Sequence, residues 1–376
     1  MVTLTRRLFA ALFVSLEGHL SVLVNAYAAP SATGALVPTT IERRAVGPKD
    51  VLIKIAYAGI CHSDIHTVRG EWGQISYPQV VGHEIVGTVA EVGSEVSLHA
   101  VGDRVGVGCM VDSCRECVNC QAGMEQYCLN GNTGTYASVD RDGTITQGGY
   151  STHIVVVEDF VLRVPEALPF EQAAPLLCAG ITTYSPLRHF DVEAGDVVGV
   201  VGLGGLGHMA VKLAKAMGAE VKVFTTSESK FEAARELGAD DVILSRDEAS
   251  MAAANRSIDV IIDTVAAPHD LNPYFRTLRL DGALFQLGLP SEAMPPVNPG
   301  TLIRRRIAYA GSLIGGIAET QEMLEFCAEH GVVSDVEVVR ADQLNEAYDR
   351  MVAGDVKYRF VLDTSTLGTP SEKADA

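Results

Sequence analysis

The feature that most constrains the fold is a glycine-rich stretch that directly follows a short apolar run. Residues 196–201 have the pattern of a buried strand, residues 202–207 are Gly-Leu-Gly-Gly-Leu-Gly, and residues 208–217 have a helical pattern. In that context the first glycine permits a tight turn, the second lets the backbone approach a pyrophosphate, and the third lets the helix lie close to the strand. The free N–H groups at the helix start then face the phosphates. An ordinary glycine turn is the alternative. The predicted dinucleotide-binding residues are Gly202, Leu203, Gly204, Gly205, Leu206 and Gly207.

Strands and helices continue to alternate after this turn. Strand-like runs at 221–224, 241–244, 258–263 and 283–287 are separated by helical stretches. Repeated βα units favour a parallel sheet with helices on both faces. Before residue 165 the chain instead has short β-branched runs between Gly, Pro and Asp, which is typical of a β-rich domain.

The predicted fold class is therefore α/β, with a Rossmann-type doubly wound parallel sheet beside a β-rich domain. A chain of 376 residues accommodates two to three domains at about 150 residues each. We expect an extension over residues 1–24, the first part of the β-rich domain over 25–165, the dinucleotide-binding domain over 166–311, and a return to the β-rich domain with a C-terminal tail over 312–376.

Five of the eight cysteines fall between residues 109 and 128. Four of them have the spacing Cys-x₂-Cys-x₂-Cys-x₇-Cys, which lets four thiolates converge on one tetrahedral zinc ion at ~2.3 Å. Four sulfurs close the coordination shell, so the site is predicted to be structural. Two strained disulfides or an iron–sulfur cluster are the alternatives, and Cys109 is interpreted as a spare thiol. The predicted ligands are Cys114, Cys117, Cys120 and Cys128.

The charge balance limits the possible partners. The chain has 29 Lys+Arg against 47 Asp+Glu, a net charge of −18. Such a chain repels phosphate backbones and anionic lipid, so we expect no nucleic-acid or membrane partner. Thr5–Phe9 and the small residues around Ala28 also suggest an export signal. However, Glu17 and His19 interrupt its apolar run, and an upstream start codon or an unstructured extension is the alternative.

A second group of metal-type residues is spread along the chain. Cys61 lies in Gly59–His66, His83 is followed by Glu84, and Cys178 lies far downstream. Two thiolates and one imidazole would leave the fourth zinc position open for water or substrate, as catalysis requires. Spacing alone does not link Cys178 to the other two. A loop histidine and two buried cysteines without metal are an equally good interpretation of the residues alone.

Taken in order, these motifs resemble those of the zinc-dependent medium-chain alcohol dehydrogenases. The segments 71–73, 111–114, 148–150, 174–180 and 315–320 are similar to the cinnamyl-alcohol-dehydrogenase-type branch. The resemblance runs from about Asn25 to Asp363 and implies a GroES-like catalytic domain that carries the structural zinc lobe. Its first strand is expected near Val24 to Tyr27. Because cleavage after Ala28 would remove that strand, we expect a cytoplasmic protein rather than an exported one.

The resemblance also implies roles for individual residues. Cys61, His83 and Cys178 would hold a catalytic zinc, and Glu84 would be the acidic neighbour able to approach or ligate it. Asp64 would orient His83. Ser63 and His66 would carry the alcohol proton to solvent, although His66 could also be a solvated loop histidine. Trp72 would line the substrate pocket, with core packing as the alternative. The further implied cofactor contacts are Ser63, Thr182, Thr264, Gly288, Ser312, Leu313 and Ile314.

The end of the second Rossmann strand predicts the choice of cofactor. An NAD-preferring enzyme places an acidic residue there on the ribose 2′-hydroxyl. This chain has Thr225, Thr226 and Ser227, followed by Lys230. Hydroxyls and an ammonium group suit a 2′-phosphate, which a carboxylate would repel. The same hydroxyls could simply cap the next helix. We therefore expect NADP(H).

The functional prediction combines these sites. We expect two zinc ions per chain and a hydride transfer that interconverts primary alcohols and aldehydes, with broad-specificity aldehyde reduction. By analogy we also expect a homodimer. The alternatives are a zinc-independent quinone or enone reductase of the same superfamily and a dinucleotide-sensing binding protein that keeps only the structural zinc.

Overall fold

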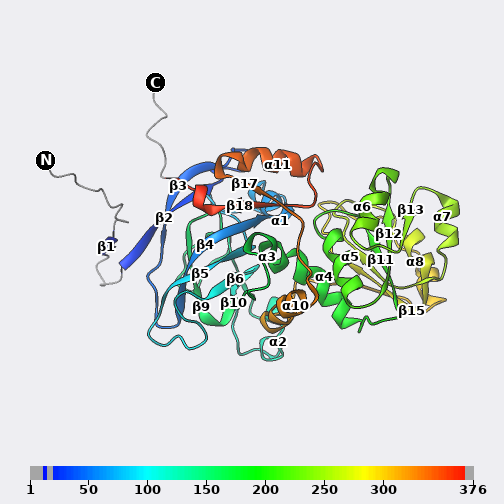
Figure 1. The fold of residues 1–376 in the computed structure, drawn as a ribbon, viewed down its shortest axis with the longest axis horizontal. Helices are drawn as coiled ribbons and strands as arrows, with labels where there is room; N and C mark the ends of the chain where they lie inside the picture. The colour runs from blue at the N-terminus through cyan, green and yellow to red at the C-terminus, as the bar shows by residue number, and fades with distance from the viewer. Residues whose placement is uncertain (1–11, 15–19, 369–376) are drawn as a thin grey trace, which may run out of the picture.

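A computed structural model describes residues 12–14 and 20–368 of the chain, and these residues form two lobes that lie side by side (Figure 1). The larger lobe is rich in strands. The smaller lobe holds a six-stranded sheet covered by helices. Helix α4 (Ala179–His189) lies where the two lobes meet (Figure 1). Within these ranges no helix has both the length and the apolar character that a bilayer crossing requires.

The smaller lobe confirms the predicted Rossmann-type sheet. Its strands run in the order β13-β12-β11-β14-β15-β16, and each neighbouring pair is parallel. Its elements are β11 (Val197–Val201), α5 (Gly207–Ala216), β12 (Glu220–Thr225), α6 (Phe231–Glu236), β13 (Asp241–Leu244), α7 (Glu248–Ala253), β14 (Ile258–Asp263), α8 (Asn272–Thr277), β15 (Leu278–Gln286), α9 (Pro299–Ile303) and β16 (Ala308–Gly311).

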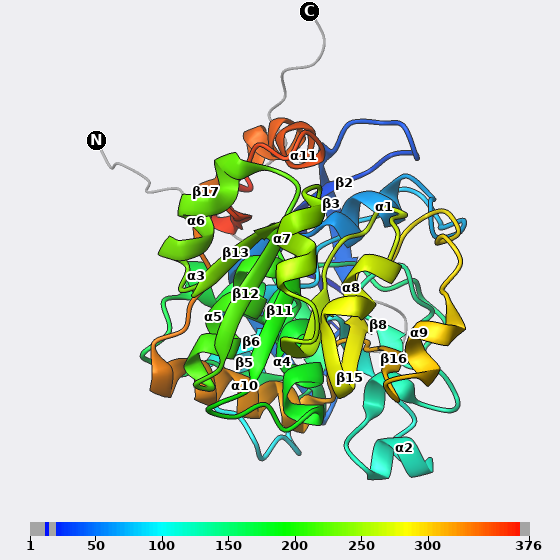
Figure 2. The same cartoon turned by 90° about the vertical axis from the view of Figure 1, so that its right-hand side faces the viewer.

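Alternate side chains of the central strand explain why helices cover both faces of this sheet. Val198 and Val200 belong to an apolar core shared with α5. Val197 and Val201 point the other way, into a second core shared with α8. Since successive side chains of a strand face opposite sides, an unbroken apolar strand must be buried twice. Figure 2 shows the sheet between its flanking helices.

The larger lobe is built on a mixed sheet in the order β10-β6-β5-β4-β18-β17, with β9 paired to β4. Its last two strands come from the end of the chain, so the C-terminal segment returns to the first lobe. The strands are β3 (Val37–Arg43), β4 (Asp50–Ile60), β5 (Ile85–Val92), β6 (Arg104–Val107), β7 (Met110–Asp112), β8 (Thr133–Gly134), β9 (His153–Val157), β10 (Leu162–Arg163), β17 (Val336–Val339) and β18 (Arg359–Asp363). The helices are α1 (His62–Val68), α2 (Val118–Gln121), η1 (Glu125–Tyr127), α3 (Phe170–Ala173), α10 (Ile317–His330) and α11 (Leu344–Val352).

The first paired strands begin earlier than the sequence suggested. β2 (Leu20–Ala28) starts before the expected Val24, and β1 (Leu12–Val14) pairs with it. Val24, Ala26 and Ala28 are buried in alternation with more exposed neighbours, which is the period of a half-buried strand. Part of the expected extension therefore belongs to a three-stranded sheet. The basic segment at residues 5–9, considered above as an export signal, lies outside the described residues.

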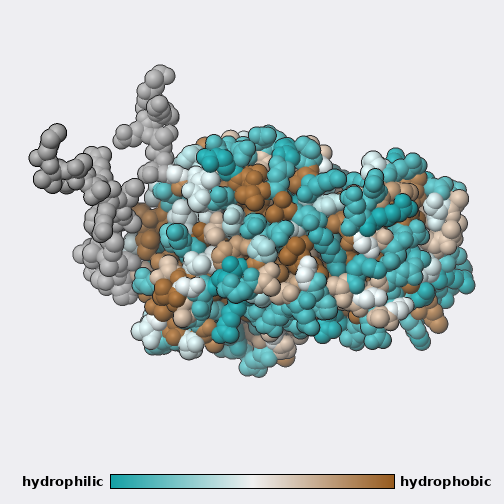
Figure 3. Space-filling view, viewed as in Figure 1, coloured by the Kyte–Doolittle hydropathy of each residue, from teal (hydrophilic) through white to brown (hydrophobic). Residues whose placement is uncertain are grey.

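Polar side chains cover most of the smaller lobe on the face shown in Figure 3.

Two candidate metal sites and a dinucleotide cleft

Three distant segments bring Cys61, His83, Glu84 and Cys178 together. Cys61 directly follows β4 and is the N-cap of α1, His83 and Glu84 directly precede β5, and Cys178 is the N-cap of α4. All four residues are buried, and one ligand atom from each lies within 4.8 Å of the others. The loop histidine and the two distant cysteines therefore share one site.

Asp64 holds this cluster in place from the first turn of α1. The backbone N–H groups of Cys61 (2.9 Å) and Gly82 (3.2 Å) and the Tyr150 hydroxyl (3.0 Å) donate to its carboxylate. His83 Nδ1 lies 3.0 Å from Oδ1 of the same group. Burial alone would lower the pKa of His83, but the Asp64 carboxylate raises it well above its ordinary value. Because Nδ1 is engaged, Nε2 is the nitrogen left for a metal.

Glu84 completes the donor set. It is fully buried, and its Oε1 pairs with the buried guanidinium of Arg359. Its Oε2 finds no hydrogen-bond partner among residues 12–14 and 20–368. Burial raises the pKa of Glu84 to about 7 against the opposing charge of Arg359. A Cβ on Gly59 would lie 1.9 Å from Oε2, so only glycine leaves room there. Two sulfurs, one imidazole nitrogen and an unsatisfied carboxylate oxygen fit a zinc ion well.

The two cysteines of this cluster have pKa values shifted in opposite directions. The pKa of Cys61 lies well below its ordinary value because Cys178 hydrogen-bonds to it. The pKa of Cys178 is raised because hydrogen bonds with the sulfurs of Cys109 and Cys61 hold its proton. A cation binding here would displace that proton. The sulfur of Cys109, interpreted from the sequence as a spare thiol, lies 3.9 Å from the carbonyl oxygen of Leu177, the residue before Cys178.

The second cluster lies in a lobe between β7 and β8. One sulfur from each of Cys114, Cys117, Cys120 and Cys128 lies within 4.8 Å of the others. The Cys120 sulfur is 3.8 Å from that of Cys114 and 3.5 Å from that of Cys117. A tetrahedron with ~2.3 Å metal–sulfur bonds has edges of roughly 3.8 Å, whereas a disulfide bond measures about 2.05 Å. Backbone N–H groups of Cys120 and Leu129 lower the pKa of Cys117 to about 6. The arrangement fits one closed tetrahedral zinc site.

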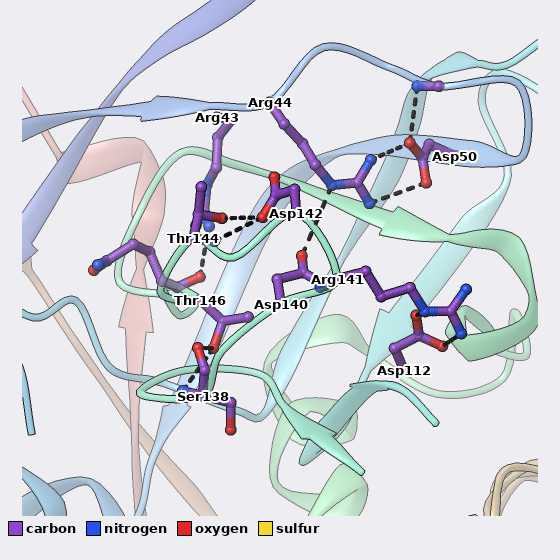
Figure 4. Close-up of polar contacts among 12 residues, drawn as sticks. Arg43, Arg44, Asp50, Asp112, Ser138, Asp140, Arg141, Asp142, Thr144 and Thr146 are labelled. Atoms are coloured by element: carbon purple, nitrogen blue, oxygen red, sulfur yellow. Dashed lines mark hydrogen bonds and ion pairs between the residues drawn. The ribbon is translucent and has the colours of Figure 1, made fainter. Parts of the chain in front are cut away.

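The base of this lobe, hereafter the cysteine lobe, is anchored by buried charge. Asp112, two residues before Cys114, accepts hydrogen bonds at 2.7 Å from both Arg115 and Arg141. Arg141 also donates to the Ser113 carbonyl at 2.8 Å. Figure 4 shows Arg141 reaching Asp112 from the loop that carries Ser138 to Thr146. The lobe is thereby fixed to the strand-rich body at the point where it leaves β7.

Polar and aromatic side chains lead from the buried cluster to the surface. Ser63 Oγ lies 3.5 Å from Cys61 Sγ. His66, one turn further along α1, stacks on Trp72 with ring centroids 4.9 Å apart, and its Nδ1 contacts the Glu71 carboxylate. Trp72 is 43% exposed, so it is not a core residue. The pairing of Glu71 with His66 was not predicted; an acid five residues after a histidine carries no periodic signal.

A cleft of about 370 Å³ opens beside this path. Gly202 has φ +87°, and a Cβ on Gly207 would lie 2.1 Å from the Gly202 carbonyl, whereas Gly204 has open space around it. These are the distinct roles that a pyrophosphate-binding turn requires. The predicted residues that line the cleft are Cys61, Ser63, His66, Trp72, Gly202, Leu203, Gly204, Gly205, Leu206, Lys230, Thr264 and Gly288.

Several other predicted cofactor residues do not line this cleft. Thr182 is buried in α4. The Thr225 hydroxyl accepts from the Ser227 N–H at 3.2 Å, so it is used within the turn, while Thr226 is exposed. Ser312, Leu313 and Ile314 lie between β16 and α10, where Leu313 is exposed and Ile314 borders a small cavity with Cys109.

Comparison with known proteins agrees with this architecture. Residues 47–166 match the family model of the alcohol dehydrogenase GroES-like domain, and residues 205–329 match that of zinc-binding dehydrogenases. The fold and site thus define a zinc-binding dehydrogenase with a GroES-like catalytic domain.

Individual proteins of this family are similar to the chain over most of its length. The chain is 59% identical over 346 residues to NADP-dependent alcohol dehydrogenase C 1 of Mycolicibacterium smegmatis, covering 92% of this chain and 99% of that protein. It is 56% identical over 348 residues to aldehyde reductase YahK of Escherichia coli, with the same two coverages. A solved cinnamyl alcohol dehydrogenase from Sorghum bicolor superposes with a TM-score of 0.89 at 45% identity, covering 94% of this chain and 100% of that one. The chain belongs to the zinc-dependent medium-chain alcohol dehydrogenase family, and the resemblance seen in its sequence is confirmed.

Proposed function

We propose that this protein is a zinc-dependent oxidoreductase that interconverts primary alcohols and aldehydes with NADP(H), and that it acts mainly as a broad-specificity aldehyde reductase. The observation that carries the proposal is the position of the Cys61–His83–Glu84–Cys178 cluster. Cys61 of this cluster lines the same cleft as the glycine turn. A zinc ion held by the cluster would supply a Lewis acid beside the dinucleotide site, which would suit hydride transfer between the nicotinamide and the carbonyl carbon of an aldehyde.

The donor sets assign the metals to residues. Cys61, His83 and Cys178 would hold a catalytic zinc, with Glu84 available as a further ligand, and the four sulfurs of the cysteine lobe would hold a structural one. When bound, the catalytic zinc supplies a Lewis acid and the nicotinamide supplies or accepts the hydride.

The chain's own residues then orient the site and move the proton. Asp64 keeps His83 in one tautomer, because its carboxylate engages Nδ1. Ser63 lies next to the Cys61 sulfur, and His66 lies near the surface against Glu71 and Trp72. A hydroxyl followed by an imidazole can pass the alcohol proton to solvent. In the reductive direction the same groups deliver it.

Thr226 and Lys230 are proposed to select NADP(H). Lys230 Nζ donates to the Leu203 carbonyl at 3.3 Å, which places its ammonium group at the edge of the glycine turn. Thr226 is exposed beside it, and the end of β12 carries hydroxyl residues rather than a carboxylate. A 2′-phosphate would meet donors and a positive charge there. The name of the M. smegmatis relative, which specifies NADP, supports the same choice.

The test is NADPH oxidation with a panel of small aromatic and aliphatic aldehydes, together with a zinc determination. We expect turnover of several aldehydes and two zinc ions per chain. Reduction of enones by a chain with one zinc or none would support the quinone reductase alternative. Two bound zinc ions without turnover of any aldehyde would support the dinucleotide sensor.

We also propose a homodimer, supported by the free edge of the Rossmann sheet. Among residues 12–14 and 20–368, β16 pairs on one side only, with β15. Three apolar side chains of the same region are exposed, Leu280 at 68%, Ile303 at 78% and Tyr309 at 40%. An unpaired edge with apolar neighbours is suited to strand pairing between two copies. Light scattering should give about twice the chain mass of 40.0 kDa, and a monomer would contradict the proposal.

A cytoplasmic location is proposed on two grounds. Cleavage after Ala28 would remove β2, although Val24 and Ala26 are buried in the strand-rich lobe. Six cysteine thiolates in two metal clusters also suit a reducing compartment. An exported, cleaved form found in cell fractions would overturn this.

A further inference from the structure

The cysteine lobe contacts the connection between β16 and α10 directly. Tyr127 Oη accepts a hydrogen bond from the Leu313 N–H at 3.0 Å, and Glu125 Oε2 accepts one from the Ile317 N–H at 3.1 Å. Between these two bonds Gly316 packs so closely that a Cβ would lie 1.8 Å from the Gly123 carbonyl. Both acceptors lie in η1, which ends one residue before the metal-type Cys128.

The two contacts cap the N-terminus of α10 and restrain the backbone of residues 313–317. α10 has Gly316 as its N-cap, and no side chain of that residue can satisfy the first N–H groups. Glu125 provides that cap, and its negative charge suits the positive end of a 14-residue helix. Ile314 has φ +36°, a conformation that a β-branched residue adopts only when its surroundings impose it. The Tyr127 hydroxyl holds the N–H of Leu313, the residue before Ile314.

The same segment reaches the reaction site on its other side. Ile314 and Gly315 border a narrow cavity together with Cys109 and Leu177. Cys109 Sγ lies 3.9 Å from the carbonyl oxygen of Leu177, which is the residue before Cys178. Contacts therefore run from the cysteine lobe, through residues 313–317, to the backbone that carries Cys178 of the catalytic cluster.

We propose that Tyr127 and Glu125 are positioning residues for the reaction. They hold the backbone of residues 313–317 in the conformation that forms the nicotinamide side of the active site, so the cysteine lobe serves cofactor binding as well as stability. The inference rests on the proposed function, since the resemblance assigns Ser312, Leu313 and Ile314 to the cofactor. Within the described part of the chain, neither side chain hydrogen-bonds to a cysteine sulfur of the lobe; each acts through the backbone it holds.

Tyr127→Phe is the most specific variant, because it removes only the hydroxyl that accepts from the Leu313 N–H and leaves the aromatic ring. A net hydrogen bond is worth about 0.5–1.5 kcal/mol, which corresponds to roughly 2- to 13-fold in an equilibrium constant. We expect the Kd of NADPH from fluorescence titration, and the KM for NADPH, to rise by about that factor. The melting temperature and both zinc ions should be retained. In hydrogen–deuterium exchange the amides of residues 313–317 should exchange faster.

Matched variants separate positioning from a general loss of structure. Glu116 is exposed on the same lobe, so Glu116→Gln should leave every readout at the wild-type value. Glu125→Gln keeps an oxygen acceptor and should be close to wild type, whereas Glu125→Ala should raise the Kd of NADPH as Tyr127→Phe does.

Two results would overturn the inference. One is a Tyr127→Phe protein with unchanged NADPH affinity and unchanged exchange at residues 313–317. The other is a Tyr127→Phe protein whose affinity falls only together with its zinc content and melting temperature, because the lobe would then be merely structural. If the wild-type enzyme reduces no aldehyde, the proposed function fails, while the NADPH titration and the exchange experiment still decide the inference.

Discussion

Replacing Asp64 by Asn should loosen the catalytic metal site and destabilise the protein, although the two side chains have nearly the same shape. The buried carboxylate accepts from four groups, two at each oxygen. Oδ1 faces the Gly82 N–H and His83 Nδ1, and Oδ2 faces the Cys61 N–H and the Tyr150 hydroxyl. An amide has only one oxygen, so in either orientation its NH₂ group meets two donors.

The size of the effect follows from those bonds. A hydrogen bond to a charged acceptor is worth about 1.5–3 kcal/mol, so two lost bonds correspond to roughly 3–6 kcal/mol. The Tyr150 hydroxyl can rotate and accept from the new NH₂ group, which favours the lower end, about 3 kcal/mol. That is a large part of the roughly 5–15 kcal/mol that stabilises a typical domain. Loss of an outer partner of a metal-bound histidine also lowers metal affinity by about 10- to 100-fold.

Urea denaturation and zinc competition with a chelator measure the two effects separately. Tyr150→Phe is the control, since it removes one donor and leaves the carboxylate with three. It should cost about half as much stability and retain the zinc. An Asp64→Asn protein with wild-type zinc affinity and stability would refute the role of Asp64 in holding the cluster.

Three further predictions concern other parts of the chain. The wild-type enzyme should favour NADPH over NADH by at least the roughly tenfold in kcat/KM that ~1.4 kcal/mol represents. The double variant Thr226→Asp with Lys230→Ala should lose or reverse this preference. A wild-type enzyme that prefers NADH would overturn the assignment. Cys114→Ser should lower melting temperature and zinc content together, because structural zinc contributes folding energy, and an unchanged melting curve would argue against a metal in the lobe. Burial lowers the pKa of His208 to about 3. Between pH 3 and about 6.5, His208 therefore binds a proton in the unfolded chain but not in the folded one. The free energy of unfolding should fall by up to ~1.4 kcal/mol for each pH unit below 6.5 in this range. His208→Gln should reduce that acid sensitivity in urea titrations at several pH values, and an identical pH dependence would contradict it.

Local patterns explain what could be predicted from the sequence. The glycine turn was recognisable because its strand, turn and helix are consecutive, and the cysteine lobe because four sulfurs lie within fifteen residues. The parallel sheet followed from regular βα alternation. Each of these features depends on neighbours in the chain, which spacing describes well.

The features that could not be predicted from the sequence depend on long-range contacts. The approach of Cys178 to Cys61 depends on how α4 docks between the lobes, and only the resemblance suggested it. The contact of the Cys109 sulfur with the Leu177 carbonyl depends on the same docking. Residues 20–24 were taken as part of an extension, although β2 begins at Leu20 and residues 22–24 pair with β3. Pairing partners and packing directions are properties of the tertiary fold, so composition and period do not contain them.

The central claim is that a zinc ion held by Cys61, His83 and Cys178 lies where the bound nicotinamide can exchange hydride with an aldehyde. The most direct test is aldehyde-dependent NADPH oxidation by Cys178→Ser, measured with its zinc content and its Kd for NADPH. The account predicts that turnover is lost and one of two zinc ions is missing, while the melting temperature and the NADPH affinity stay close to wild type. A Cys178→Ser protein that reduces aldehydes at the wild-type rate would contradict it.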